Sequence, residues 1–494
     1  MEVLAIVLVT LFTLYIIHYL YNWMNNKNKK FPPGPRKLPL IGNLHIVLLK
    51  GLHQTLLKLS EIYGPVFSIQ MGMRKMVVLS GYDAVKDALV THAEDFEERP
   101  KIPIFEKMDN GLGLSFSHGE NWRIMRRFTI STLRDFGMGK RSLEEKITEE
   151  CSHLIKNIKN FKGEPFDNTR ITTSAVSNII VSMLLGNRMD YEDPQFNRLL
   201  DLINENLRLL ADKMILLYNL YPVLGILPGS HKTFQKNVKE LHTFIQCTFM
   251  KHLKVLDMND QRSFVDAFLA KQSMEKVNSQ SYFHNDNLTS LIRSLFTAGT
   301  ETTSTTIRWC LLMMIKYPHY QEKVQEEISK VIGVAKPNCS HRLQMPFTNA
   351  VIHETQRFTD ILPLSLPHET ARDVNFRGYH LPKGTYIIPL LTSVLHDKKQ
   401  FKAPKEFDPN NFLDSNGQFV KNEAFLAFSA GRRVCAGENL ARMELFLFFT
   451  SLLQKFTFRL PPGVSEANLT SNVGLTQAPV HQKICAIPRI HEDA

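Results

Sequence analysis

Closely spaced cysteine pairs are missing from this chain of 494 residues. Its six cysteines stand singly, with no Cys-x-x-Cys motif and no further Cys or His at zinc-ligand spacing. Small secreted domains and structural zinc sites both depend on such spacing. The pattern therefore argues against a disulfide framework and a zinc centre. It favours a reducing compartment and leaves each cysteine to be judged from its own surroundings.

Nucleotide and nucleic-acid signatures are missing as well. There is no Gly-x-Gly-x-x-Gly fingerprint for a nicotinamide or flavin, and no helix-turn-helix, zinc-finger or RNA-binding motif. The chain nevertheless carries a net charge of +11. A basic balance without such a motif favours anionic lipid or an acidic protein as the partner, and we expect no nucleic acid.

Tryptophan is scarce, whereas phenylalanine is abundant. The chain has three Trp and 32 Phe, within a composition that is 44% hydrophobic and 22% charged. These proportions are typical of a globular protein rather than a disordered one. The phenylalanines predict a large apolar core or an apolar cavity, and ordinary core packing would account for most of them.

The longest apolar run lies near the N-terminus. Residues 3–20 are apolar except for two threonines and a histidine, close to the length of about 17–25 residues that spans a bilayer. Acidic Glu2 precedes the run and a lysine-rich segment follows it, which reverses the charge order of a cleaved signal peptide. We therefore predict a single N-terminal transmembrane helix (1–23), a basic and proline-rich hinge (24–36), and one large cytosolic domain (37–494).

The rest of the chain is predicted to be mainly α with a smaller β portion. Short segments rich in β-formers occur at residues 66–69 and 75–79, and again over residues 376–389. In the last of these, residues 381–384 predict a turn between two strands. Most other segments have a helical period, so a single α-rich unit is the expectation.

Two helices stand out from the pattern. One begins after Asp286, which we interpret as its N-cap, and ends at Tyr317, because Pro318 cannot continue it. About 30 residues give a helix of roughly 45 Å, long enough to cross a large domain. Residues 438–456 predict a second strong helix that is apolar on one face.

The most informative cysteine is Cys435. Gly431 and Gly437 flank it, and the predicted helix begins directly afterwards. The glycines would allow a tight turn, and the positive end of the helix N-terminus would favour thiolate over thiol. Arg433 adds positive charge suited to an anionic group nearby. An inert buried cysteine needs none of these features, whereas an activated nucleophile or a metal ligand would use them all.

The segment Phe428-Ser-Ala-Gly-Arg-Arg-Val-Cys435-Ala-Gly437 matches the pattern Phe-x-x-Gly-x-Arg-x-Cys-x-Gly. This is similar to the haem-binding loop of the cytochrome P450 superfamily. The resemblance covers essentially the whole chain, and the order of its motifs resembles the microsomal animal enzymes of family 2. It implies the cytochrome P450 fold, haem b as cofactor, O2 as cosubstrate, and Cys435 as the iron ligand in a haem-thiolate catalytic domain.

A second motif, Ala298-Gly299-Thr300-Glu301-Thr302-Thr303, lies midway along the long predicted helix. A glycine there costs about 1 kcal/mol, and a threonine that bonds back to the previous turn can open a local bulge. Taken alone, the polar residues could simply face solvent. The resemblance implies instead that Thr302 assists proton delivery to iron-bound oxygen, with Glu301 as the acid behind it.

Further residues follow from the resemblance. Glu354 and Arg357 match the family's Glu-x-x-Arg pair, although alone they would be a common surface pair of small value. The Arg that usually completes this network is replaced by Asn411. Besides Cys435, the implied haem contacts are Arg99, Trp122, Arg126, Ala298, His368, Phe428, Arg433 and Gly437.

The resemblance also implies a lipophilic substrate, either a xenobiotic, a steroid or a fatty acid. The implied substrate contacts are Ser115, Phe116, Phe296, Ala298, Gly299, Leu362, Leu366 and Thr476. The apolar stretch 216–228 predicts either a membrane-dipping segment or a buried connector. By analogy the chain belongs to the endoplasmic reticulum membrane and faces the cytosol.

Electrons must come from another protein, because the chain has no flavin or nicotinamide motif. The analogy implies NADPH–cytochrome P450 reductase, with cytochrome b5 as a second donor. A basic face for such acidic partners is predicted at Arg123, Arg127, Arg134, Lys140 and Arg141, although charge runs often only solvate a surface.

Three functions are compatible with a haem site. The first is a monooxygenase that inserts one atom of O2 into the substrate. The second is a peroxide isomerase or dehydratase, which the Glu301-Thr302 pair disfavours because such family members often lack it. The third is a non-catalytic membrane haem protein, which would consume no NADPH in response to substrate.

Overall fold

The computed structural model describes residues 30–47, 51–254, 260–275, 281–472 and 474–489, together with Thr10, Thr13 and Asp257. The predicted anchor, residues 1–23, lies outside the described residues apart from the two threonines. Among the helices in the described ranges, none is both long and apolar enough to cross a bilayer.

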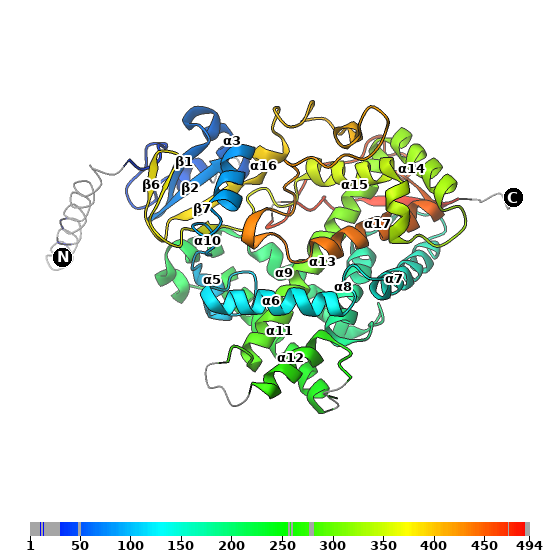
Figure 1. Cartoon of the computed structure of the whole chain (residues 1–494), viewed down its shortest axis with the longest axis horizontal. Coiled ribbons are helices and arrows are strands. Elements are labelled where there is room, and N and C mark those ends of the chain that lie inside the picture. Colours follow the sequence, from blue (N-terminus) through cyan, green and yellow to red (C-terminus); the bar gives the residue numbers. More distant parts are fainter. Residues whose placement is uncertain are drawn as a thin grey trace.

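Helices make up most of the described chain, as predicted, and a long central helix passes through them (Figure 1). The α-helices are α2 (Leu44–Val47), α3 (Leu52–Tyr63), α4 (Tyr82–Lys86), α5 (Pro103–Asp109), α6 (Gly119–Asp135), α7 (Arg141–Lys159), α8 (Thr169–Leu185), α9 (Pro194–Leu209), α10 (Lys213–Leu220), α11 (Ser230–Lys254), α12 (Phe264–Met274), α13 (Asn285–Lys316), α14 (Pro318–Val331), α15 (Pro346–Thr359), α16 (Leu391–Leu395) and α17 (Glu438–Lys455).

The smaller β portion is also present, and most of it gathers at one end of the molecule beside α3 (Figure 1). Its strands are β1 (Val66–Met71), β2 (Arg74–Ser80), β3 (Phe166–Asp167), β4 (His368–Glu369), β5 (Val374–Phe376), β6 (Tyr379–Leu381), β7 (Tyr386–Leu390), β8 (Phe456–Arg459) and β9 (Lys483–Pro488). One sheet has the order β1-β2-β7-β4, a second has the order β3-β9-β8, and β5 pairs with β6.

The predicted turn at residues 381–384 does join two strands, β6 and β7, but these strands do not pair with each other. β6 pairs antiparallel with β5, whereas β7 pairs parallel with β2. Parallel neighbours require a long crossover rather than a tight turn. The chain therefore returns from the helical part of the molecule to place β7 beside a strand from its N-terminal part.

The long helix predicted after Asp286 is α13, a helix of 32 residues, or about 48 Å. Its N-cap is His284, whose side chain accepts a hydrogen bond from Asn287, so the prediction of Asp286 as the cap is wrong. The helix ends at Lys316 as expected, and Pro318 then starts α14, since proline has no N–H to lose in a first turn.

The second predicted helix, α17, ends at Lys455, and Phe456 begins β8. We predicted one apolar face, but α17 is buried on nearly every side from Leu440 to Gln454. A helix that is apolar all round belongs inside a domain. Several of the many phenylalanines are used here, because Phe446, Phe448 and Phe449 are fully buried in the largest core cluster.

The Glu354–Arg357 pair on α15 is fully buried, with 0% exposure of either side chain, so a surface pair is excluded. Arg357 donates two hydrogen bonds to the Glu354 carboxylate, at 2.7 and 2.6 Å. Asn411 donates to the same carboxylate at 3.3 Å, and the Asp408 backbone N–H donates at 2.9 Å. Asn411 therefore occupies the third arm of this network with a longer bond.

We predict that Arg357→Ala lowers the free energy of unfolding by about 3–5 kcal/mol, because it leaves the buried Glu354 carboxylate without its counter-charge. Asn411→Ala removes one neutral donor and should cost only about 1 kcal/mol. Denaturant unfolding of both variants tests this, and equal losses would contradict the network described here.

Candidate active site

A cavity of about 360 Å³ lies between α13 and the loop that carries Cys435, and most of its lining is apolar. It is lined by many residues that the sequence singled out: Arg99, Ser115, Phe116, Trp122, Arg126, Ala298, Gly299, Glu301, Thr302, Leu362, Leu366, Phe428, Arg433, Cys435, Gly437 and Thr476. Segments far apart in the chain therefore meet around one space.

The loop before α17 depends on Gly431. This residue has a φ of +74°, and a Cβ placed on it would lie 1.8 Å from the carbonyl oxygen of Leu89, so only glycine fits. The loop is closed by a hydrogen bond from the Cys435 backbone N–H to the Phe428 carbonyl at 3.0 Å. Gly437 differs, because nothing lies within 4 Å of a Cβ placed there, and its space is open.

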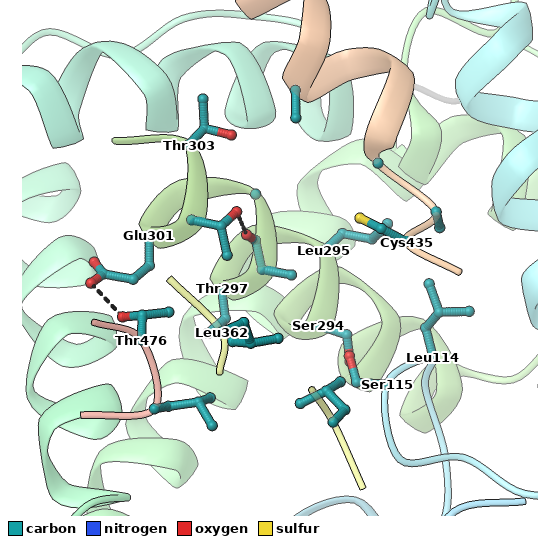
Figure 2. A pocket seen from close by; sticks show the side chains of 18 of the residues that line it. Leu114, Ser115, Ser294, Leu295, Thr297, Glu301, Thr303, Leu362, Cys435 and Thr476 are labelled. Carbon is teal, nitrogen blue, oxygen red and sulfur yellow. Dashed lines mark hydrogen bonds between the residues drawn. The ribbon is translucent and has the colours of Figure 1, made fainter. Parts of the chain in front are cut away.

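The Cys435 sulfur faces the cavity, and Figure 2 shows it on the loop beside α13. Burial raises the pKa of its thiol above the usual 9.0, and the negative charge of Glu438 acts in the same direction. The Gly437 N–H and Arg126 lower the pKa without cancelling the effect of burial. In the polypeptide alone, burial therefore outweighs the groups of the loop that favour the thiolate. Coordination to a metal ion would ionise the thiol.

Arg433, predicted to supply positive charge for a nearby anionic group, contacts backbone carbonyls and an aromatic ring. It donates to the carbonyl oxygens of Glu97 and Ser117, at 2.8 and 2.9 Å, and its guanidinium lies 3.7 Å from the Trp122 ring centre. Its Nη1 is buried without a hydrogen-bond partner. Burial lowers the pKa of Arg433 to about 8.

Two further guanidinium groups, those of Arg99 and Arg126, face the same space. Arg99 donates to the carbonyls of Leu366 and Pro367, and Arg126 donates to the carbonyl of Val434. Burial lowers the pKa of Arg99 to about 9. Within the described part of the chain, neither these two arginines nor Arg433 has a carboxylate within 4 Å.

This set of residues fits a haem group. Buried cations bonded only to carbonyl oxygens suit the two propionate carboxylates of a haem, and an unpartnered guanidinium N–H is a donor of the right kind. A sulfur on the cavity wall suits the iron. The open space over Gly437 leaves room beside that sulfur.

His368 is not on the cavity wall. It lies buried on β4, and its Nδ1 is 2.6 Å from the carbonyl oxygen of Phe96. Burial, with Arg99 and Arg433 nearby, holds the pKa of His368 well below 6.5, so the ring is neutral. A direct contact from His368 to the cofactor stays a prediction.

The motif from Ala298 to Thr303 lies on the opposite wall of the cavity, within an unbroken α13. The Thr302 hydroxyl donates to the Ala298 carbonyl at 2.7 Å, so the predicted back-bond is present without a break in the helix. Packing explains the glycine at position 299, because a Cβ there would come within 2.6 Å of the Ile180 side chain on α8. The glycine lets two helices approach closely.

Glu301 points away from the sulfur. Its Oε1 accepts hydrogen bonds from Thr305 and Thr476, both at 3.2 Å, and Figure 2 shows the second of these. Burial raises the pKa of Glu301, while Arg308 and the two hydroxyls lower it. The carboxyl is therefore enclosed rather than facing bulk solvent, which excludes the solvent-facing interpretation.

Most of the predicted substrate contacts line the cavity, but Phe296 does not. Phe296 is buried in the largest core cluster, since its position on α13 turns it away from the cavity that Leu295 and Ala298 line. Phe116 stacks on Phe105, with ring centres 4.0 Å apart. Other lining residues belong to no motif and had not been predicted; they include Phe105, Ile180, Leu207, Phe234, Val238 and Arg293.

The site defines a haem protein with a cysteine ligand, and comparisons with known proteins place it in a family. The family model described as "Cytochrome P450" matches residues 32–486. Cytochrome P450 2K4 of Oncorhynchus mykiss is 49% identical over 93% of this chain and 92% of its own length. Cytochrome P450 2C5 of Oryctolagus cuniculus is 47% identical over 94% and 96%. Cytochrome P450 2C25 of Mesocricetus auratus is 44% identical over 98% and 99%.

The chain therefore belongs to the cytochrome P450 family. It is a haem-thiolate monooxygenase, with haem b as cofactor and O2 as cosubstrate. The family implies a redox partner that delivers electrons and substrates that are lipophilic.

We predict that Arg433→Met reduces haem occupancy about tenfold or more, because a hydrogen bond to a charged group contributes about 1.5–3 kcal/mol. The ratio of haem to purified protein measures this. Arg134→Met, exposed on the same helix α6, is the matched control and should keep wild-type occupancy. Equal haem content in all three proteins would contradict a propionate role for Arg433.

We predict that the free energy of unfolding depends on pH through His118, which lies between Glu106 at 3.1 Å and Glu98 at 3.8 Å. The nearby carboxylate of Glu98, followed by the hydrogen bond to Glu106, raises the pKa of His118 above 6.5. Its contribution to stability is therefore complete below that value and is lost as pH rises through the raised folded pKa.

The free energy of unfolding of wild type and His118→Gln, measured on both sides of this range, tests the prediction. Wild type should exceed the variant by more at acidic pH than at alkaline pH. A difference that does not vary with pH would contradict the His118 assignment.

Proposed function

We propose that this enzyme oxidises lipophilic substrates with electrons from NADPH–cytochrome P450 reductase, with Cys435 as the iron ligand and Thr302 and Glu301 as the proton-delivery residues. The observation that carries the proposal is that Cys435, Thr302 and Glu301 line one apolar cavity. When bound, the haem supplies the iron at which O2 is activated, so that one oxygen atom enters the substrate and the other leaves as water.

Proton delivery is assigned to the hydroxyl of Thr302 and the carboxyl of Glu301. The hydroxyl is held by the Ala298 carbonyl, which fixes its direction beside the cavity. Burial keeps the carboxyl protonated to a higher pH than that of an exposed glutamate, so it can act as an acid nearer neutrality. This supports monooxygenation over peroxide isomerisation, because an isomerase does not need protons for oxygen cleavage.

Substrate selection is assigned mainly to packing. Phe116, Leu362 and Leu366 contribute apolar walls, and Ser115 contributes a hydroxyl. Arg293 is a charged lining residue that sequence patterns did not indicate, and it is paired with the buried carboxylate of Asp109. A lipophilic molecule with few polar groups fits such a surface.

Reductase docking is assigned to the outer face of α6. Arg127 and Arg134 are exposed on this helix, and Lys140 is exposed just before α7. Arg126, on the inner face of the same helix, donates to the carbonyl of Val434, next to Cys435. An acidic partner bound to α6 would therefore lie close to the cysteine loop, which favours electron transfer. Cytochrome b5 would use the same basic face.

Membrane contact is assigned to the predicted anchor (1–23) and to an exposed apolar patch. Within the stretch 216–228, Tyr218 is buried and Leu216 packs against a core cluster, whereas Val223 and Ile226 are 73% and 81% exposed. The later part of the stretch is therefore available to lipid. The Tyr221 hydroxyl donates to the Leu40 carbonyl, which brings exposed Leu40 to the same area. The basic segment after the anchor supports a cytosolic orientation at the endoplasmic reticulum.

We predict that Thr302→Ala and Glu301→Gln each reduce the product formed per NADPH by about tenfold, since general acid–base groups typically contribute 10²–10⁴-fold and water substitutes in part. Product yield and hydrogen peroxide release are measured together with the purified reductase. Thr289→Ala is the control, because Thr289 makes the same back-bond on α13 but does not line the cavity. Unchanged yield in the first two variants would contradict the proton-delivery assignment.

A charge-reversal pair tests the docking face. Arg127→Glu with Lys140→Glu should weaken reductase binding about tenfold at low salt, because like charges across an interface oppose association. Lys58→Glu with Lys383→Glu, both exposed at the sheet end, carries the same charge change and should bind as wild type. Equal weakening by the two pairs would contradict a specific site on α6.

A further inference from the structure

The Glu301 carboxyl is held by residues from two different segments. Thr305 lies one turn further along α13, whereas Thr476 comes from the loop 474–479, far along the chain. Both hydroxyls donate to the same carboxyl oxygen at 3.2 Å. Figure 2 shows the carboxyl directed at Thr476 and away from Cys435.

Hydrogen bonds from α13 also hold the loop 474–479. The Trp309 ring N–H donates to the carbonyl of Gln477 at 2.8 Å, and Arg308 donates to the carbonyl of Pro479 at 3.1 Å. The Gln477 N–H donates to the Ile361 carbonyl at 2.9 Å, on the segment after α15. The position of the Thr476 hydroxyl is therefore fixed by several bonds that do not involve Glu301.

Thr476 was predicted as a substrate contact, and it does lie on the cavity wall. However, the side chain is only 7% exposed, and its hydroxyl is already used on Glu301. Its neighbour Leu475 is 37% exposed and lines the same cavity. In this loop, Leu475 is therefore the residue available to pack against substrate. The Thr476 hydroxyl has a different role.

We propose that Thr476 is a positioning residue whose hydroxyl holds the Glu301 carboxyl against the loop 474–479 and so controls how that carboxyl supplies protons to Thr302. The inference rests on the proposed function, in which Glu301 is the acid. Because Leu475 and Thr476 are adjacent, a substrate that packs on Leu475 acts on the same loop that holds the acid.

The charges around Glu301 give the expected direction of a pH effect. Arg308 is the charged group that faces it, and Asp167 on β3 interacts in turn with Arg308. The hydroxyls of Thr305 and Thr476 stabilise the ionised carboxylate, as Arg308 does, whereas burial destabilises it. Without the Thr476 hydroxyl the carboxyl therefore remains protonated to a higher pH.

The test compares Thr476→Val, which keeps the shape and removes the hydroxyl, with Thr476→Ser, which keeps the hydroxyl. Hydrogen peroxide released per NADPH oxidised is measured with purified reductase across neutral to alkaline pH, without added substrate and with 7-ethoxycoumarin. Haem content and the reduced carbon-monoxide spectrum establish that each variant is folded. The same two substitutions are also made in a Glu301→Gln background.

In wild type, peroxide release should rise with pH as Glu301 loses its proton. Thr476→Val should move this rise to higher pH by about one unit, since the lost hydrogen bond is to a charged group. Thr476→Ser should follow wild type. In the Glu301→Gln background, Thr476→Val should change nothing.

Two results would overturn the inference. One is a Thr476→Val profile that coincides with wild type while Glu301→Gln alters it, which leaves the proposed function intact. The other is an equal shift in the Glu301→Gln background, which would mean that Thr476 acts on something other than Glu301. If Glu301→Gln itself behaved as wild type, the proposed acid role and the inference would fail together.

Discussion

The electrostatics of the cavity impose the constraint on which the rest of the structure depends. Burial raises the pKa of the Cys435 thiol, and the chain supplies too little positive charge at the sulfur to reverse this. On the same walls, burial lowers the pKa of Arg99 and Arg433, whose partners are backbone carbonyls. A haem complements both groups, since its iron carries the positive charge that a thiolate needs and its propionates carry the negative charge that the arginines need.

The scaffold holds these groups on the walls of one cavity. Gly431 allows the cysteine loop to pass against the backbone of Leu89, and Gly299 allows α13 to approach α8. The buried Glu354–Arg357 pair fixes α15 to the segment around Asp408. A close backbone approach at Gly431 therefore sets the path of the cysteine loop, and the contact of Gly299 with Ile180 sets the spacing of α13 and α8.

Sequence patterns predicted the parts of the site that rest on local chemistry. The cysteine loop, the Thr302 back-bond and the buried Glu354–Arg357 pair each follow from short motifs, and the structure has all three. Patterns failed where the outcome depends on three-dimensional surroundings. Phe296 turns away from the cavity because of its position on the turn of α13, and His284 rather than Asp286 is the N-cap because its side chain accepts the Asn287 N–H. No sequence pattern indicated the cavity residues of α8, α9 and α11, because in the sequence an apolar residue that lines a cavity resembles one that fills a core.

The central claim is that Cys435 is the axial ligand of the haem iron. The most direct measurement is the absorption spectrum of the reduced carbon-monoxide complex of wild type and Cys435→Ser, at matched haem content. The account predicts that wild type has the long-wavelength Soret band produced by a thiolate ligand, and that Cys435→Ser loses this band. A Cys435→Ser protein that kept the thiolate-type band would contradict the account, because another residue would then be the ligand.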